Sequence, residues 1–417
     1  MSATELAPAF FLALIVILLV CRLVGWVLRA AGQPPVVGEM VAGVVLGPSV
    51  LGLALPGVED FVFPQQLRPV LYVVGQIGLV VFMFKAGYEF RTEQIRRVAG
   101  PASLISAAGM VVPLLLGALL TWLARGRVHI FPPGVPLFVS VSFVAVTIAI
   151  TAFPMLARII NERGLTHTRF GSLSLACGAL DDAVAWLLLA GVMSVAAGSA
   201  GPVSLALGGT LVLLAILLAA LKVRGRFDTA SSRLAPEHLL LAVVVLLFLA
   251  AWYTDKIGLY AVFGAFSLGV VFPRTEAVER AVATLTPVAT VFLPLFFTYS
   301  GLNTDFGLLV QPSVLLFAVG ALVVAVAGKF GACWAAARLT GESNEIALRV
   351  GTLMNARGLM QLIAINVGLA AGIVTRELFS VLVLVAVVTT VMATPMLSLW
   401  DRREVRRRAP AELAPQT

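Results

Sequence analysis

Long apolar runs alternate with short polar segments along the whole chain, and the runs are longer than the strands or helices of most water-soluble proteins. A helix that spans a membrane needs about 20 predominantly apolar residues. We count roughly thirteen such runs and expect an all-α polytopic membrane protein. The runs lie near 7–30, 35–53, 69–89, 99–123, 135–158, 171–197, 203–221, 237–253, 257–272, 284–301, 311–337, 345–371 and 377–400.

Composition supports the membrane interpretation. Of the 417 residues, 60% are hydrophobic and 12% are charged, which leaves too few polar side chains to cover a water-soluble fold of this length. The net charge is +8, and about 20 of the 29 Lys and Arg residues lie in alternate loops and the C-terminal tail. Because short cytoplasmic loops collect Lys and Arg, we expect a cell-membrane protein with its N-terminus outside and its C-terminus in the cytoplasm.

The polar stretch at 222–236 divides the predicted spans into two groups. Two six-span units that start on opposite faces of the membrane form an inverted repeat, which is a common plan in transporters. We therefore expect one transmembrane domain at 1–402 and a short cytoplasmic tail at 403–417. Within the domain, repeat one covers about 7–197, a connector helix about 203–221 and repeat two about 237–400.

Two spans carry helix-breaking residues at matching places in the two halves. Proline removes a backbone hydrogen bond, and an arginine flanked by glycines in mid-membrane favours unwinding. We expect both spans to be discontinuous helices that cross at a midplane site, with a simple kink as the alternative for the proline. The residues are Thr151 and Pro154 in one span, and Gly351, Asn355, Arg357 and Gly358 in the other.

Ionisable side chains deep inside apolar runs are costly in lipid and mark functional sites. Asp181 and Asp182 lie near the middle of their run. Adjacent helix positions are about 100° apart, so the two carboxylates face different directions and have different roles. One meets a basic partner, for which Lys329 and Arg357 are the candidates. The other faces a water-filled cavity and holds a proton or a small cation in turn.

Weaker signals surround this pair. A static salt-bridge network of Asp181, Asp182 and Lys329 is the structural alternative, although it leaves one buried charge uncompensated. Glu39 and Glu89 lie nearer the predicted cytoplasmic side, where each lines an entrance or caps a helix. The three cysteines lie within apolar runs as packing residues, and the three histidines lack the spacing of a zinc site. We therefore expect no resident cofactor.

Six stretches, in this order, carry a family resemblance. Through them the chain resembles the monovalent cation:proton antiporter family, especially the Kef-like and plant cation/proton exchanger branch of the sodium/proton antiporter superfamily. The resemblance implies a thirteen-helix fold with a core domain, a dimerisation domain, an elevator-like movement of the core, a homodimer and a part in pH homeostasis. The stretches are Gly38–Gly52, Ala86–Glu89, Thr151–Arg158 followed by Glu162 and Leu165, Asp181–Asp182, Gly301–Asp305 and Asn355–Leu359.

The resemblance also implies roles for single residues. Asp182 matches the aspartate that binds the ion and carries the proton, Asp181 matches the acidic position before it, and Lys329 matches the basic partner of that position. Four further residues match positions that shape the cation site where the broken helices cross, namely Thr151, Pro154, Asn355 and Arg357.

Three residues depart from the pattern of the family and leave the ion selectivity open. They are Ala149 in place of a frequent serine, Gln361 in place of a frequent glutamate and Lys85 at a usually apolar position.

The expected function is secondary active exchange of a monovalent cation for protons, with Na+ first and K+ next, bound at Asp182. One alternative is a sodium-coupled organic-anion symporter, in which Arg357 binds a carboxylate. A gated K+ efflux system is a second. A membrane-embedded enzyme is a third, but the sequence shows no convincing nucleophile or metal constellation, so we expect a protein that is not an enzyme.

Overall fold

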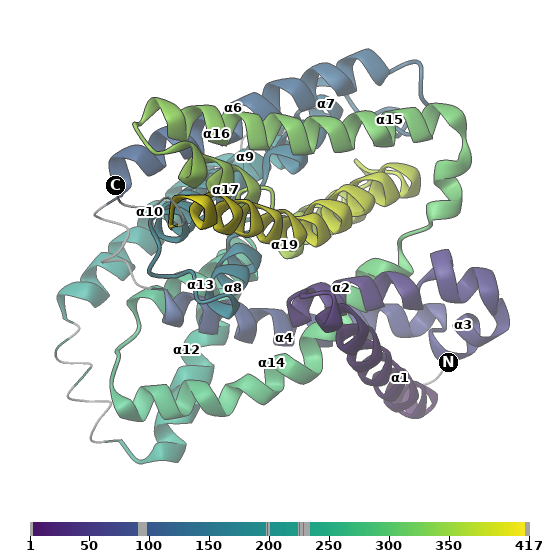
Figure 1. Ribbon diagram of the computed structural model, residues 1–417. Coiled ribbons are helices and arrows are strands. Elements are labelled where there is room, and N and C mark those ends of the chain that lie inside the picture. The colour runs from purple at the N-terminus through teal and green to yellow at the C-terminus, as the bar shows by residue number, and fades with distance from the viewer. Residues whose placement is uncertain are drawn as a thin grey trace, which may run out of the picture. The chain divides into compact units, whose positions relative to one another are not determined.

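The computed structural model is helical throughout the part of the chain that it describes, with no strand in that part (Figure 1). Within it, nine helices are long and apolar enough to cross a membrane, and four shorter apolar helices accompany them. The nine and the four together coincide with the thirteen predicted runs, so the all-helical polytopic prediction is confirmed. The described residues are 3–90, 98–196, 198, 201–223, 225, 228 and 234–412.

The structure describes only part of the basic residues on which the predicted orientation depends. Several basic loop residues behind the predicted orientation lie outside the described residues, namely Arg91, Arg96, Arg97, Arg224, Arg226 and Arg233.

The chain forms two compact units, and each unit takes segments from both halves of the sequence. The first comprises Met1–Val24, Glu39–Glu93 and Trp186–Asp305. The second comprises Gly25–Gly38, Gln94–Ala185 and Phe306–Thr417.

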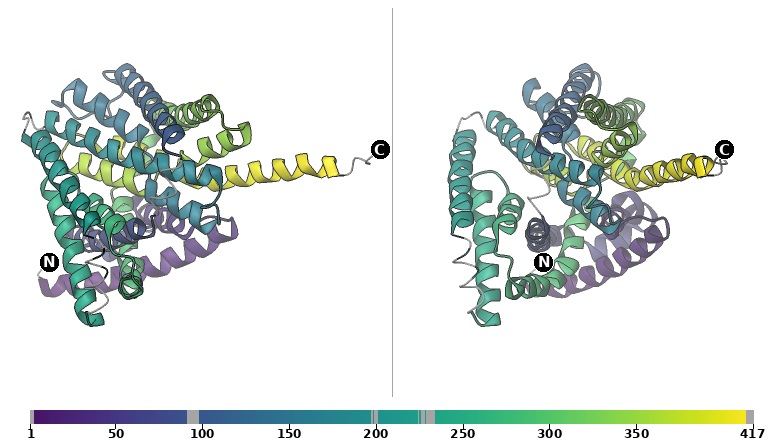
Figure 2. Two further views of the ribbon diagram at one scale, coloured as in Figure 1. Left: turned by 90° about the vertical axis from the view of Figure 1, so that its left-hand side faces the viewer. Right: turned by 60° about the vertical axis from the view of Figure 1, so that its left-hand side comes forward.

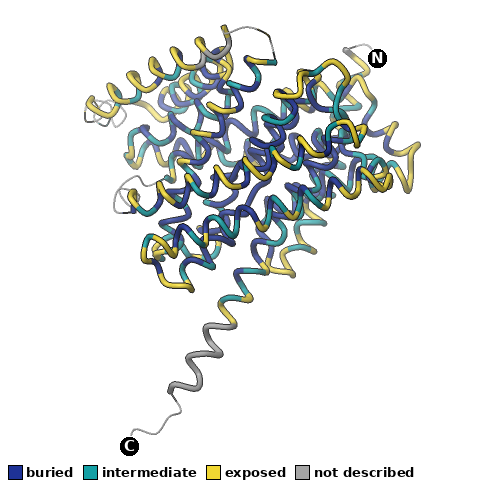
Figure 3. Tube along the Cα trace, turned by 90° about the horizontal axis from the view of Figure 1, so that it is seen from above, coloured by how far each residue is buried: buried dark blue, intermediate teal, exposed yellow. Residues whose placement is uncertain are grey.

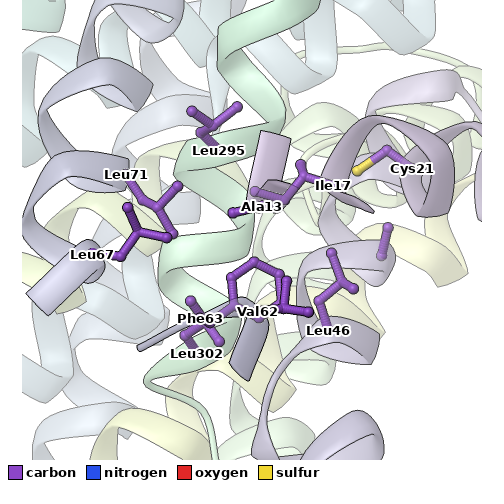
Figure 4. Packing of buried hydrophobic residues seen from close by; sticks show 11 residues of the cluster. Ala13, Ile17, Cys21, Leu46, Val62, Phe63, Leu67, Leu71, Leu295 and Leu302 are labelled. Carbon is purple, nitrogen blue, oxygen red and sulfur yellow. The ribbon is translucent and has the colours of Figure 1, made fainter. Parts of the chain in front are cut away.

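The first unit is built around an apolar cluster contributed by its N-terminal helices and one later helix (Figure 4). Ile17, Phe63 and Leu71 are fully buried there and meet Leu295 and Leu302 from near the end of the unit. The elements of this unit are α1 (Ala3–Ala30), α2 (Pro35–Leu46), η1 (Pro48–Gly52), α3 (Pro56–Val62), η2 (Gln65–Leu67), α4 (Arg68–Glu89), α10 (Gly201–Lys222), α12 (Pro236–Lys256), α13 (Ala261–Val271) and α14 (Glu276–Leu302), with a minor part of α1 and α2 belonging to the second unit.

Glycines let helices of the first unit approach one another at backbone distance. A Cβ added at Gly78 of α4 would lie 2.3 Å from the backbone nitrogen of Leu293 in α14. At Gly87 it would lie 2.1 Å from the carbonyl oxygen of Phe266 in α13. Small residues at such crossings are the usual basis of tight packing between membrane helices. The packing that results leaves no room for side chains at these positions.

A buried carboxylate, Glu59, stands out in the first unit outside the predicted spans. Its Oε1 lies 3.6 Å from Nη2 of Arg68, and Arg68 also donates to the carbonyl oxygen of Leu302 at 3.3 Å. Burial raises the pKa of Glu59; Arg68 partly offsets this, and Asp60 and Asp305 raise it further. The pair ties α3 to the start of α4 and the end of α14.

The second unit contains most of the residues singled out from the sequence. Its last helix is one continuous rod in both views of Figure 2, and it includes most of the expected tail, up to Glu412. Figure 3 shows buried and exposed positions recurring along the described helices. The elements are α6 (Ala99–Ala124), α7 (Leu137–Ala149), α8 (Phe153–Glu162), most of α9 (Arg169–Ala196), η3 (Phe306–Val310), α15 (Pro312–Val323), η4 (Val324–Gly328), α16 (Lys329–Leu339), α17 (Asn344–Leu353), α18 (Leu359–Ala370) and α19 (Arg376–Glu412).

One span of the second unit changes its helical register in the middle. α15 and α16 are joined without a break by η4, a single π-helical stretch at Val324–Gly328. A π turn accommodates one extra residue, and such turns recur at functional sites. The residue that follows this turn is Lys329.

Candidate ion and proton site

Two helices of the second unit are interrupted, and their unwound segments meet. α7 ends at Ala149 and α8 begins at Phe153; α17 ends at Leu353 and α18 begins at Leu359. The backbone N–H of Ala152 donates to the carbonyl oxygen of Ala356 at 3.1 Å, which joins one break to the other. The predicted pair of crossed, discontinuous helices is therefore present.

Pro154 lies at the start of α8 and not inside a continuous helix. Proline is favoured in the first turn because its missing N–H would have no helical partner there and because its φ is already helical. The expectation of a broken helix is met here, and the alternative of a simple kink is not. Pro154 starts the second half of the span.

Asp181 is fully buried and receives hydrogen bonds from three side chains. Its Oδ1 accepts from Ser106 Oγ at 2.5 Å. Its Oδ2 accepts from Lys329 Nζ at 2.8 Å and lies 2.8 Å from Thr151 Oγ1. A buried carboxylate is costly unless it is paired and hydrogen-bonded, and these contacts supply both requirements. Of the two basic candidates, Lys329 is the partner of Asp181.

Two buried cations meet the C-terminal end of α7. Lys329 Nζ donates to the carbonyl oxygen of Ala149 at 2.7 Å. Arg357 donates through Nη1 to the carbonyl oxygen of Thr147 at 3.2 Å, and through Nη2 to that of Ala325, in the π turn, at 3.2 Å. The last carbonyl groups of a helix have no helical partner and carry partial negative charge, so cations stabilise this end.

Asp182 occupies the complementary position at the N-terminal end of α8. Its Oδ1 lies 3.5 Å from the backbone nitrogen of Phe153, the first residue of that helix. The residue is 9% exposed, whereas Asp181 is 0% exposed. Anions are stabilised at helix N-termini, but this one bond is long. Of the two carboxylates, Asp182 is the less tightly bound.

Two residues of the crossing segments have spare hydrogen-bonding capacity. Thr151 Oγ1 lies 2.8 Å from Asp181 Oδ2 and 3.3 Å from the carbonyl oxygen of Met354, and its single proton serves one of them at a time. Asn355 donates to the carbonyl oxygen of Gly351 at 3.1 Å, while its own Oδ1 is buried without a hydrogen-bond partner in the described part of the chain. Oxygen atoms of this kind are the ligands that hard monovalent cations require.

Helix α6 contributes residues that reasoning from the sequence did not identify. Ser106 contacts Asp181, and Met110, one turn later, places its Sδ 3.9 Å from Lys329 Nζ. Between them, a Cβ at Gly109 would lie 2.5 Å from Cys333 Sγ and 3.8 Å from Lys329 Nζ. The available sequence signal was small residues and a hydroxyl in an apolar span, which is too common to single out a site.

The remaining predicted residues make other contacts. Glu89 is exposed at the end of α4 and pairs with Lys85, its Oε1 3.8 Å from Lys85 Nζ. Glu39 is half-buried in α2. Both belong to the first unit. Gln361 is buried in α18, where Nε2 donates to the carbonyl oxygen of Leu382 at 3.3 Å.

The site combines a carboxylate that is paired and hydrogen-bonded, Asp181, with a carboxylate that is held by one long bond among the described residues, Asp182. Two cations, Lys329 and Arg357, are fixed at the end of α7. Among the described residues, no group of three or more His, Cys, Asp or Glu side chains is placed to hold a metal ion. Such an arrangement suits reversible binding of a small ion or a proton better than covalent chemistry.

Broken helices that cross in mid-span around buried charges define a secondary transporter of the inverted-repeat class. The family model described as "Sodium/hydrogen exchanger, transmembrane" matches residues 11–400. The chain therefore belongs to the sodium/hydrogen exchanger family of membrane transporters.

Individual proteins agree with this assignment. The chain is 35% identical to the Na(+)/H(+) antiporter NhaS4 of Synechocystis over 394 residues, which cover 92% of this chain and 95% of that protein. It is 32% identical to K(+)/H(+) antiporter 1 of Saccharomyces cerevisiae, of which it spans 45%. The solved structure of the sodium proton antiporter MjNhaP1 from Methanocaldococcus jannaschii matches 95% of this chain with a TM-score of 0.59 at 15% identity, which shows a shared fold.

Proposed function

We propose that this chain exchanges Na+ for protons, with Asp182 as the group that binds each in turn. The observation that carries the proposal is the unequal treatment of the two neighbouring carboxylates. Asp181 is occupied by Ser106, Thr151 and Lys329, whereas Asp182, among the described residues, has one long bond to the N-terminus of α8. A carboxylate that must bind and release a proton and a cation in turn cannot be occupied by strong hydrogen bonds from the protein.

In this mechanism the ionised Asp182 attracts a cation, and a proton displaces the cation in the next step. The positive end of α8 and oxygen atoms of the crossing segments, among them Thr151 and the Oδ1 of Asn355, complete the cation shell. Lys329 neutralises the charge of Asp181, so that Asp182 is the carboxylate that attracts the ion. Alternating access to the two faces of the membrane, through an elevator-like movement of the core in a homodimer, turns this competition into exchange.

We propose Na+ over K+ because of the names of the proteins that this chain resembles. NhaS4, which the chain matches along nearly its whole length, is named a Na(+)/H(+) antiporter, and the yeast relative, of which the chain spans 45%, is named a K(+)/H(+) antiporter. We place the protein in the plasma membrane with its N-terminus outside and its C-terminus in the cytoplasm, because Lys and Arg concentrate in alternate loops.

Proton flux in everted membrane vesicles tests the proposal. Na+, Li+ and K+ are added in turn across pH 6.5–8.5 while a fluorescent probe reports the vesicle pH. We expect Na+ to release protons, with K+ weaker. Cation-independent signals would refute exchange, and Na+-driven uptake of an organic anion without proton release would favour a symporter.

The variant Asp182→Asn is expected to abolish exchange, because a neutral amide cannot cycle a proton. Asp60→Asn, the same substitution at an exposed position of α3, serves as the control and retains exchange. Full activity of Asp182→Asn would show that another residue binds the cation and the proton.

A further inference from the structure

The polar end of helix α19 contacts one half of each broken helix. The apolar run of α19 ends with the sequence Ser398-Leu-Trp-Asp401. Ser398 and Asp401 are three positions apart, so they lie on one face of the helix. This face meets Arg163, which follows α8, and Arg349, which belongs to α17. The two half-helices therefore share a point of attachment on α19.

The attachment of α17 combines a buried cation with a half-exposed carboxylate. Arg349 Nη2 lies 3.1 Å from Asp401 Oδ1, and Arg349 Nε lies 3.4 Å from the same oxygen. The guanidinium also lies over the ring of Phe170, near the start of α9, 5.3 Å from its centroid. Arg349 is 7% exposed, and a cation buried to this degree is costly unless it is paired. The carboxylate and the ring together fix the orientation of its planar group.

Asp401 also faces the end of the other half-helix. Arg163, the residue that follows α8, donates through Nη2 to Ser398 Oγ at 2.8 Å, and its Nη1 lies 4.0 Å from Asp401 Oδ2. One carboxylate therefore lies between guanidinium groups from α8 and α17, with a different oxygen atom toward each. Such a shared anion holds close together two cations that would otherwise repel each other.

The two half-helices carry groups that line the proposed ion site. Phe153, the first residue of α8, presents its backbone nitrogen to Asp182, and α17 leads into the break that contains Asn355. Each half-helix has 10 residues, which is about 15 Å of length, so a shift at the attachment reaches the break as a shift of the whole helix. A further contact to α19 lies beside the break: Trp400 Nε1 donates to Thr352 Oγ1 at 3.0 Å.

We propose that Asp401 is a positioning residue that fixes α8 relative to α17, so that the groups around Asp182 keep the spacing that a bound Na+ requires. The inference rests on the exchange function proposed above. Asp401 acts on the ion through the two half-helices and their arginines. Packed side chains and rigid helices can couple two distant positions, and changes along such a network alter the affinity of a site that they do not touch. The end of α19 thereby contributes to ion affinity as well as to packing.

The test measures Na+-driven proton flux in vesicles as a function of Na+ concentration at one fixed pH. Asp401→Asn keeps the size of the side chain and removes its charge, so the two guanidinium groups lose their shared anion. We expect the Na+ concentration for half-maximal flux to rise about threefold to tenfold, while the maximal rate changes by less than about twofold. Asp401→Glu retains the carboxylate and is expected to stay within about twofold of the wild type in both quantities.

Arg349→Gln, alone and combined with Asp401→Asn, tests whether Asp401 acts through α17. Arg349→Gln removes the buried cation and is expected to raise the half-maximal Na+ concentration by a similar factor. The effects of residues in one network do not add, so the double variant should resemble either single variant. Independent effects would instead multiply in the double variant, and that result would overturn the inference.

Glu345→Gln is the matched control, because it makes the same change from carboxylate to amide at an exposed position in the first turn of α17. It is expected to keep the wild-type Na+ dependence. A wild-type half-maximal Na+ concentration in Asp401→Asn would overturn the inference, as would an Asp401→Glu variant that behaves like Asp401→Asn. Loss of the maximal rate alone would also overturn it, since that is the result of a purely structural role.

Failure of the proposed function has a different signature. A wild-type protein that shows no Na+-dependent proton flux would overturn the exchange function itself. Wild-type flux with an unchanged Na+ dependence in the Asp401 variants would overturn only the inference about α19. The two failures are therefore distinguishable.

Discussion

The two broken helices of the second unit differ in what meets their free ends. At the break between α7 and α8, full charges are in place: Lys329 and Arg357 at the C-terminal carbonyls and Asp182 at the N-terminal end. At the break between α17 and α18, the side-chain contacts to backbone carbonyl groups are neutral, from Thr151 to Met354 and from Asn355 to Gly351. This difference in charge supports our proposal that the ion binds at the first break, with the second break shaping the site.

The largest expected effect comes from removing the charge at the first break. Lys329→Gln leaves Asp181 buried without its cation, and breaking such a pair costs about 3–5 kcal/mol. The apparent unfolding temperature in detergent, followed by intrinsic fluorescence, should fall clearly. Lys85→Gln is the control, since Lys85 pairs with Glu89 at a partly exposed position. Equal unfolding temperatures for the two variants would contradict the charged account of this break.

The second effect concerns Arg357. Its planar guanidinium reaches the carbonyl groups of Thr147 and Ala325 together, and a lysine, which presents a compact charge, cannot match this fork. Arg357→Lys should therefore lose about 1–3 kcal/mol for a carbonyl left unpaired. Thermal unfolding of Arg357→Lys against wild type measures this cost. An unfolding temperature of Arg357→Lys equal to that of the wild type would show that the paired hydrogen bonds of the guanidinium are not needed for stability.

A backbone effect at the second break comes next. Gly358 adopts φ 95° and ψ −118°, a conformation that L side chains avoid. Gly358→Ala is expected to cost about 1–3 kcal/mol. Gly331→Ala, inside α16 where an added Cβ meets no atom within 4 Å, is the control and should not destabilise the protein. Matching unfolding curves for the two variants would remove the conformational reason for glycine at this break.

The smallest effect on stability is expected at Asn355. Asn355→Ala removes a local bond to Gly351 and a buried oxygen that has no hydrogen-bond partner among the described residues, so stability should change by at most about 1 kcal/mol. The Na+ concentration for half-maximal flux should nevertheless rise several-fold if Oδ1 is a ligand of the ion. A destabilisation as large as that of Arg357→Lys, with unchanged Na+ dependence, would give Asn355 a structural role.

Much of this architecture was accessible from the sequence, and the reasons are physical. The lipid solvent forces long apolar segments, so the helices could be counted directly. Pro154 and Gly358 indicate the two breaks. Proline fixes φ and has no N–H to donate, and glycine permits backbone conformations that other residues avoid. Asp181 and Asp182 were conspicuous because charge is rare in mid-membrane.

Contacts made by ordinary residues were not accessible. Nothing in the sequence distinguishes Ser106 from other serines in apolar spans, and its role depends on which helix faces α6. The sequence also does not distinguish Lys329 from Arg357 as the partner of Asp181, since both are mid-span. The π turn before Lys329 carries no proline or charge that would reveal it.

That π turn makes the length of the span, and not only its side chains, part of the site. A π turn holds one residue more than an α turn, so deleting one residue within Val324–Gly328 would restore an ordinary helix and leave the following lysine close to its present direction. It would also close the wide turn in which the carbonyl oxygen of Ala325 accepts from Arg357. The inserted residue has no side-chain chemistry of its own to preserve. It widens the backbone of the turn, and a shortened chain with every charged group intact would still have lost the carbonyl geometry to which Arg357 donates.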